Sequence, residues 1–222
     1  MRKSFSVLAL VFCGLWCGSL AMGSSLCVGT PGNLVVNCGF ETGNFTGWTI
    51  SGNTANPNGN YYGVDAYDAN SGSFGAFMSQ DFFVGTAPVD LSQTLATVAG
   101  DTYQISFFLE QDTAPTTAGY IHAFSATFGG TTMLTLTPTV ALPGSLAYTE
   151  YTFSETATAP STTLQFDFEN DDNYWSFDDV SVTLTSTASS APEPSAGLLG
   201  GTALVALLLL RRRRYGRFAR QI

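Results

Sequence analysis

Short runs in which apolar and polar residues alternate follow one another through most of the 222-residue chain. From 103 to 110 the odd positions are apolar, while Gln104 and Ser106 face the other way. Leu164, Phe166 and Phe168 alternate with polar residues in the same manner. A period of two is typical of strands with one buried face. The pattern predicts strands at 33–40, 48–51, 74–78, 91–98, 103–110, 120–128, 132–137, 148–153, 163–168 and 177–185.

Turn signals separate these strands. Gly129-Gly130 fits a two-residue type I′ turn, because glycine adopts positive φ at both positions without strain, and Phe128 should then pair with Thr131. Residues 51–60 and 65–73 are rich in small polar residues and are expected to be exposed loops. With no ten-residue helical pattern among the strands, the sequence predicts an all-β fold, an antiparallel jelly-roll sandwich over residues 26–185.

The first 21 residues have the three parts of a secretory signal peptide. Arg2 and Lys3 supply a positive start, residues 5–16 are mostly apolar, and Ser19-Leu20-Ala21 is a small-x-small cleavage sequence. We expect cleavage after Ala21. No cysteine follows the small residues of a lipoprotein signal, so no lipid anchor is expected.

The other end of the chain predicts a membrane anchor. Residues 186–195 form a flexible stalk, residues 196–210 carry no charge, and a basic tail occupies 211–222. Fifteen helical residues rise about 22 Å, short of the roughly 30 Å hydrocarbon core, so this transmembrane helix is marginal. Flanking arginines stay cytoplasmic, which places everything before Pro192 outside. The alternative is a buried terminal helix, which four consecutive arginines disfavour.

The order of these parts resembles a known sorting signal. Pro192-Glu193-Pro194, then the short apolar segment, then Arg211, Arg212, Arg213 and Arg214 look like the PEP-CTERM signal. The resemblance implies an exosortase, a membrane-embedded processing enzyme, as a partner in Gram-negative bacteria that make extracellular polysaccharide. It implies a protein that is exported and either anchored at the cell envelope or surface or released to the matrix after tail processing. The tail is sometimes labelled the C-terminal domain of ice-binding proteins, a label that we do not extend to the rest of the chain.

The charges are divided sharply along the chain. All eight basic residues lie at the two ends, and all seventeen acidic residues lie between Ser4 and Leu210. An exported part without Lys or Arg repels nucleic acid and anionic lipid. Neutral sugars and divalent cations are the partners of compatible charge.

Two cysteines remain after removal of the signal peptide, Cys27 and Cys38. In an exported protein, a pair eleven positions apart is expected to form one disulfide. Metal ligation by two lone cysteines is much less favoured, and a single histidine argues against zinc.

Both ends of the predicted domain resemble galactose-binding-like jelly rolls, which include several carbohydrate-binding module families. The similar parts are 33–41 with Gly47-Trp48, and the closing run 175–182. The resemblance implies that the first and last strands are neighbours with a structural Ca²⁺ between them. Glu41 and one or both of Asp178 and Asp179 would be its carboxylate ligands. The alternative is that these acids lie on a solvated edge without metal.

Sugar binding requires aromatic platforms together with a few polar groups. The candidate platforms are Tyr61, Tyr62, Tyr67 and Trp175, with Asn58, Asn60 and Asp65 nearby in sequence. Packing under a loop is the alternative for the three tyrosines. Trp48 is assigned to the core.

The leading hypothesis is a non-enzymatic surface protein that binds extracellular polysaccharide or other matrix components. The alternative is a structural or adhesive matrix protein without a defined sugar ligand. A glycoside hydrolase is a third hypothesis, because it needs two carboxylates about 5 to 9 Å apart. Its candidate pairs are Glu110 with Asp112, and Asp167 with Glu169, although the second pair also fits an exposed strand face. His122 has no motif partner and is expected to be structural.

Overall fold

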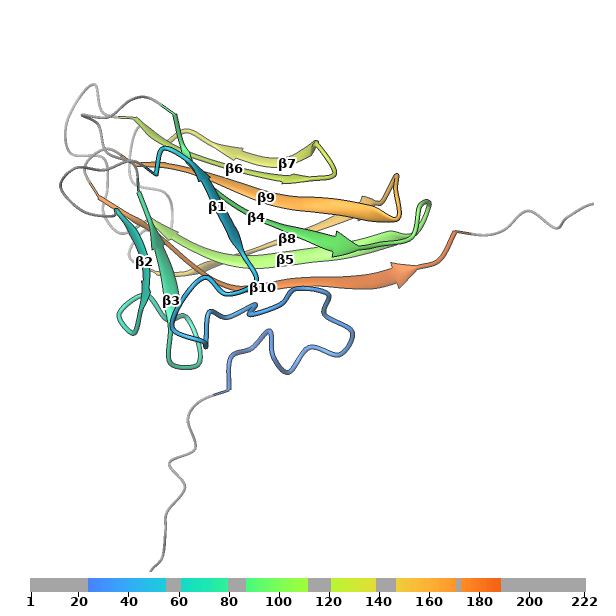
Figure 1. The fold of residues 1–222 in the computed structure, drawn as a ribbon, viewed down its shortest axis with the longest axis horizontal. Helices are drawn as coiled ribbons and strands as arrows, with labels where there is room; N and C mark the ends of the chain where they lie inside the picture. The colour runs from blue at the N-terminus through green and yellow to red at the C-terminus, as the bar shows by residue number, and fades with distance from the viewer. Residues whose placement is uncertain are drawn as a thin grey trace, which may run out of the picture.

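The computed structural model describes residues 24–54, 61–79, 87–111, 121–138, 147–170 and 173–188. These residues form ten β-strands and no helix, so no described segment could cross a membrane as a helix (Figure 1). The strands are β1 (Thr49–Gly52), β2 (Tyr62–Asp65), β3 (Gly75–Met78), β4 (Val89–Ala96), β5 (Thr102–Gln111), β6 (His122–Phe128), β7 (Thr131–Leu136), β8 (Thr149–Thr156), β9 (Ser161–Asn170) and β10 (Trp175–Ser186).

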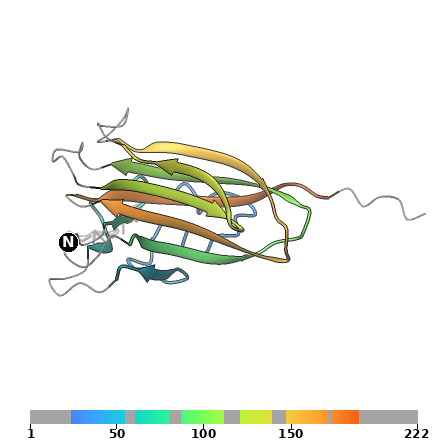
Figure 2. The same ribbon diagram turned by 90° about the horizontal axis from the view of Figure 1, so that it is seen from above.

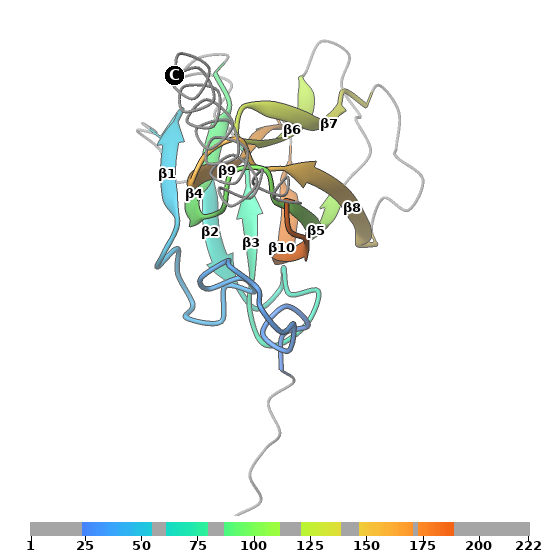
Figure 3. The ribbon, with the colours of Figure 1, turned by 90° about the vertical axis from the view of Figure 1, so that its right-hand side faces the viewer.

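The strands form two five-stranded sheets. The first has the order β1-β4-β9-β6-β7 and the second the order β2-β3-β10-β5-β8, and all recorded pairings are antiparallel. The longer strands run side by side along the long axis, and the end view shows one sheet above the other (Figures 2 and 3). The all-β, two-sheet prediction is confirmed, and the architecture is consistent with a jelly-roll sandwich.

Phenylalanines from both sheets meet in the core. The ring centroid of Phe107 on β5 lies 5.1 Å from that of Phe166 on β9 and 5.7 Å from those of Phe124 and Phe177. All four side chains are almost completely buried. The alternation seen in the sequence therefore marks the inward faces, and aromatic packing between the sheets supplies much of the stabilising contact.

The glycine hairpin forms as predicted. Gly129 and Gly130 have φ values of 59° and 82°, and Phe128 pairs with Thr131 across the turn. Trp48 is also in the predicted place, since it is buried and its ring centroid lies 5.8 Å from that of Phe40.

The predicted strand at 33–40 is wrong. Asn37 and Phe40 have φ values of 51° and 55°, in the left-handed region, so this segment is a series of turns and not a strand. It still lies beside β10, because the N–H of Leu34 donates to the carbonyl of Val182 and the N–H of Val180 donates to the carbonyl of Cys38. Strand β2 was not predicted, because it is short, contains a glycine and lies between two polar loops.

Several predictions fall outside the described residues. They are the signal peptide at 1–21, Asn58, Asn60, Asp112, Pro192-Glu193-Pro194, the helix at 196–210 and Arg211 to Arg214. These stay predictions from the sequence.

Candidate ligand-binding site

A pocket of about 340 Å³ opens at one edge of the second sheet. It is lined by Asp65 at the end of β2, Tyr67 and Asp68 in the loop that follows, Phe77 on β3, and Tyr174, the residue before β10. Three aromatic rings and two carboxylates in one pocket supply both apolar contact and hydrogen-bond acceptors, the combination that sugar-binding sites use.

Asp65 shapes the loop that carries Tyr67. Its Oδ1 accepts hydrogen bonds from the backbone N–H of Tyr67 at 2.8 Å and of Asp68 at 3.2 Å, so the side chain turns the chain at the end of β2. Tyr67 at this turn is 97% exposed. The loop therefore holds an aromatic ring in solvent, where a ligand can reach it.

Phe77 and Tyr174 form the aromatic part of the pocket. Their ring centroids are 5.3 Å apart and the ring planes are nearly perpendicular. Phe77 lies directly opposite Gly63 in the β2–β3 pair. A Cβ atom at Gly63 would lie 2.5 Å from Cζ of Phe77, so the ring can cross β2 only because residue 63 has no side chain.

Asp68 ties the pocket loop to the second sheet. The hydroxyl of Ser176 on β10 donates to Oδ1 of Asp68, and the hydroxyl of Tyr148 donates to the Asp68 carbonyl. Burial raises the pKa of Tyr148 far above its ordinary value, and the charges of Asp178, Asp68, Glu110 and Asp179 raise it further. The phenol therefore stays protonated and can donate its hydrogen bond to the Asp68 carbonyl.

Asp178 and Asp179 on β10 hold the next part of the same loop. Oδ2 of Asp178 accepts the backbone N–H groups of Asn70 at 2.9 Å and Ser71 at 3.1 Å. Oδ2 of Asp179 accepts hydrogen bonds from Nδ2 of Asn70 at 2.9 Å and from the hydroxyl of Ser71 at 2.6 Å. Burial raises the pKa of Asp178 to about 8, helped by the charge of Asp179 and opposed by the backbone hydrogen bonds from Ser71, Asp179 and Asn70.

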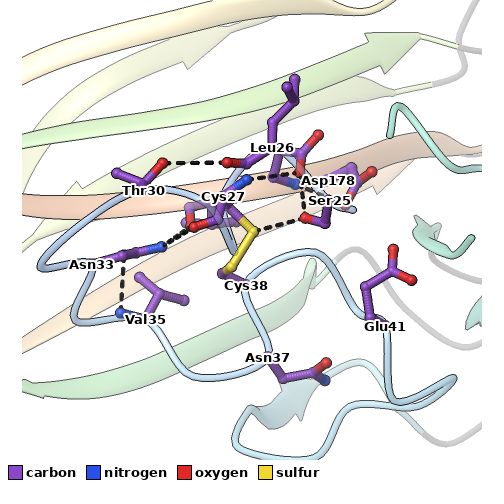
Figure 4. Close-up of a disulfide and its surroundings, with 12 residues drawn as sticks. Ser25, Leu26, Cys27, Thr30, Asn33, Val35, Asn37, Cys38, Glu41 and Asp178 are labelled. Carbon is purple, nitrogen blue, oxygen red and sulfur yellow. Dashed lines mark hydrogen bonds between the residues drawn. A yellow bond between two sulfur atoms is a disulfide. The ribbon is translucent and has the colours of Figure 1, made fainter. Parts of the chain in front are cut away.

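Asp179 also holds the N-terminal segment. Its Oδ1 accepts the hydroxyl of Ser25 at 2.6 Å and the N–H of Cys27 at 3.3 Å. Cys27 is joined to Cys38 by a disulfide, and both cysteines are buried (Figure 4). One carboxylate thus connects the disulfide loop, the last strand and the loop that lines the pocket.

Glu41 contacts a different stretch of the loop. Its carboxylate accepts the N–H of Ser73 at 2.9 and 3.1 Å and that of Phe74 at 3.4 Å. In Figure 4 it lies on a separate turn of the chain, away from Asp178. Glu41 and the aspartate pair therefore do not converge on one point.

This arrangement does not fit a calcium ion as it stands. Ca²⁺ takes six to eight oxygen ligands, whereas backbone and amide N–H groups point at the carboxylates of Asp178 and Asp179. No three acidic, histidine or cysteine side chains in the described ranges are placed to hold a metal. Calcium binding at Glu41, Asp178 and Asp179 remains a prediction from the sequence, and the hydrogen-bonding pattern argues against it.

Of the predicted platforms, only Tyr67 lines the pocket. Trp175 is completely buried, and its Nε1 donates to the carbonyl of Glu169 at 3.1 Å, so its prediction as a platform is corrected. The first residue of β10 points between the sheets and not outward. Tyr61 and Tyr62 are half-buried, and the ring of Tyr62 lies 6.2 Å from that of Phe45.

The sequence reasoning missed Asp68, Phe77 and Tyr174. Phe77 is the outward residue of a predicted strand and Tyr174 stands beside a tryptophan, so neither has a pattern of its own. Aromatic residues flanking the predicted loop at 65–73 were the only available signal.

A second group of acids lies on the outer face of the first sheet. Asp90 on β4 lies opposite Asp167 on β9, and Asp167 accepts hydrogen bonds from Ser125 and Gln165, each at 2.7 Å. The pKa of Asp90 is raised to about 6, first by burial and then by the charge of Asp167 and a hydrogen bond with it, while a hydrogen bond from Ser51 opposes the shift. Asp167 and Glu169 line a small pocket of about 160 Å³.

Of the other candidates for catalysis, Glu110 and His122 lie on different sheets, and Asp112 is outside the described residues. Glu110 lies on the second sheet, where it pairs with Ser176. His122 is buried at the start of β6, opposite Asn170 on β9, as expected of a structural histidine.

Comparison with known proteins gives structural neighbours only. No family model matches the chain, and no curated protein does. The CBM61 module TmCBM61, solved in complex with β-1,4-galactotriose, is 20% identical, with 69% of this chain and 99% of the module covered and a TM-score of 0.49. The CBM22-1 xylan-binding domain of Paenibacillus barcinonensis Xyn10C is 15% identical, with 68% and 93% covered and a TM-score of 0.44.

An enzyme domain is also among the neighbours. The enzymatically active domain of bacteriophage CBA120 tailspike protein 4 is 15% identical, with 69% of this chain but only 21% of that domain covered and a TM-score of 0.48. Several structural neighbours are thus carbohydrate-binding modules, and the likeness concerns the arrangement of the strands.

Proposed function

We propose that the β-sandwich binds extracellular polysaccharide and does not catalyse a reaction. The observation that carries this proposal is the pocket at the edge of the second sheet, where exposed Tyr67 stands beside Phe77, Tyr174 and two aspartates. A pyranose ring has apolar C–H faces and hydroxyls around its rim. Aromatic rings pack against the C–H faces, and carboxylates accept hydrogen bonds from the hydroxyls.

The pocket is held in shape before any ligand arrives. Asp65 fixes the turn under Tyr67, Ser176 and Tyr148 fix Asp68, and Gly63 leaves room for Phe77. A preformed site avoids the entropic cost of ordering loops on binding.

The test is binding of the purified protein to a panel of polysaccharides, measured by affinity electrophoresis and calorimetry. Tyr67→Ala should weaken binding about two- to tenfold, because a stacked aromatic ring contributes on the order of 0.5–1.5 kcal/mol. Tyr67 is almost fully exposed, so its removal should leave the melting temperature unchanged. Leu184→Ala, at the other end of β10 and half exposed, is the matched control.

Two other functions would give different results. A structural or adhesive matrix protein would bind no polysaccharide in the panel, yet would associate with itself or with the cell surface. A glycoside hydrolase would release sugars from a polysaccharide, and turnover would stop in Asp167→Asn or Glu169→Gln, whose parent side chains share the smaller pocket.

We further propose that the protein is exported with its signal peptide removed and is sorted by its PEP-CTERM-like tail. An exosortase-type enzyme is the expected partner, and the membrane anchor and basic tail are the parts it would act on. Mass determination of the mature protein from cells and from medium tests this. Cleavage after Ala21 and near Pro192 in the released form is expected, and an intact chain in the cytosol would refute the proposal.

A further inference from the structure

We infer that the pocket discriminates glycans by charge. It binds neutral sugars, binds sugars with free amino groups more tightly, and rejects uronic acids and sulfated or phosphorylated sugars. This inference rests on the proposed sugar-binding function and adds the chemical class of the ligand.

Two carboxylates line the pocket itself. Asp65 uses Oδ1 for the N–H groups of Tyr67 and Asp68, and its Oδ2 accepts no hydrogen bond from the described part of the chain. Asp68 lies in the same turn and also lines the pocket, and its Oδ1 accepts a hydrogen bond from the hydroxyl of Ser176. An ammonium group entering the pocket would therefore meet carboxylate oxygen close to the exposed ring of Tyr67.

Further carboxylates lie behind the pocket wall. The hydroxyl of Tyr148 contacts the backbone of Asp68, and its pKa responds to the charges of Asp178, Asp68, Glu110 and Asp179. Asp178, with a pKa of about 8, is largely protonated at neutral pH, so the charges that act on this point beside the pocket are those of Asp68, Glu110 and Asp179. Their fields add, and a partly buried site screens them less than open water would.

Within the described ranges no Lys or Arg side chain offsets this charge. The chain has no Lys or Arg between Ser4 and Leu210, and His122 is buried in the first sheet. An anionic sugar would meet only like charge. A protonated amine would gain from the carboxylates and from the face of Tyr67, since aromatic rings attract cations.

Acetylation of an amino sugar provides a clean comparison, because it removes the charge and keeps the pyranose ring. We would measure binding of full-length protein to oligomers of β-1,4-glucosamine, of β-1,4-N-acetylglucosamine and of galacturonic acid by calorimetry at neutral pH or slightly below. The glucosamine oligomer should bind about tenfold more tightly than its acetylated form at low salt, and 0.5 M NaCl should remove most of the difference. The galacturonate oligomer should not bind.

Asp65→Asn tests whether the effect is local. The amide keeps an oxygen for the N–H groups of Tyr67 and Asp68 but removes the charge, so the preference for the amine should fall several-fold while the fold is retained. Glu155→Gln is the control, since it removes one charge seven residues along β8 from Tyr148, about 23 Å away at 3.3 Å per residue. It should leave the preference unchanged.

These outcomes distinguish failure of the charge preference from failure of the proposed sugar binding. Equal binding of the two glucosamine polymers, tight binding of galacturonate, or an equal effect of Asp65→Asn and Glu155→Gln would overturn the charge preference. If none of the three oligomers binds but another polysaccharide binds through Tyr67, only the charge preference falls. If no glycan binds at all, both proposals fall.

Discussion

The hydroxyl of Ser25 lies 2.6 Å from Oδ1 of Asp179, although the two residues are 154 positions apart. The other oxygen of this carboxylate holds Asn70 and Ser71 in the loop that continues from the pocket. A single side chain on the last strand therefore fixes both the N-terminal segment and the pocket loop.

Asp179→Ala should destabilise the domain by about 2–4 kcal/mol, because it leaves several buried or half-buried donors without an acceptor. Thermal or urea unfolding measures the loss. Glu150→Ala is the matched control, since Glu150 is an exposed acid on β8, and it should change the free energy of unfolding by less than about 0.5 kcal/mol. Equal effects of the two substitutions would show that the Asp179 side chain does not stabilise the N-terminal segment or the pocket loop.

Removing the disulfide should also destabilise the domain. Cys27 and Cys38 close a loop with a separation of 11 residues, and the chain-entropy relation for such a loop gives about 3 kcal/mol. The double variant Cys27→Ser with Cys38→Ser should show this loss in urea unfolding without reductant. Reductant should lower the melting temperature of the wild type and leave that of the double variant unchanged.

The acids on the first sheet should make stability depend on pH. The pKa of Asp90 is raised to about 6 in the folded state from an ordinary value of 3.8, so the folded state binds this proton more tightly than the unfolded state. The resulting stabilisation is fully present below about pH 3.8 and is lost as pH rises through about 6. Melting temperatures from pH 3.5 to 7.5 should therefore fall more steeply for the wild type than for Asp90→Asn.

Asp178 contributes a slope of the same sign, because its pKa is raised to about 8. The difference between the wild type and Asp90→Asn isolates the contribution of Asp90, since Asp178 is common to both proteins. Parallel melting curves for the two proteins over this pH range would contradict the assignment.

A chelator decides between the calcium prediction and the hydrogen-bonding pattern. Because N–H groups occupy the carboxylates of Asp178 and Asp179, we expect EDTA to leave the melting temperature of the purified protein unchanged. A lower melting temperature that added Ca²⁺ restores would instead support the sequence prediction. Magnesium added in place of calcium is the control for ionic strength.

Much of the fold follows from local sequence. The period of two predicted the inward faces of β5 and β9, and Gly129-Gly130 predicted the β6–β7 hairpin. Both succeed because strand pleat and turn geometry depend on a few adjacent residues. The strand prediction at 33–40 fails because the conformation of this segment depends on contacts with a distant strand and not on adjacent residues. That segment has apolar residues, but Asn37 and Phe40 adopt left-handed φ values in a structure held by contacts with β10.

Three features can be read from the order of residues: the period-two strands, the absence of basic residues between Ser4 and Leu210, and the spacing of Cys27 and Cys38. The tertiary structure alone decided that Trp175 points inward, that Phe77 and Tyr174 join Tyr67, and that Asp179 meets Ser25. The difference comes from distance along the chain. Alternation is set by neighbouring residues, whereas the pocket depends on strand order and on side-chain packing between residues as far apart as Phe77 and Tyr174.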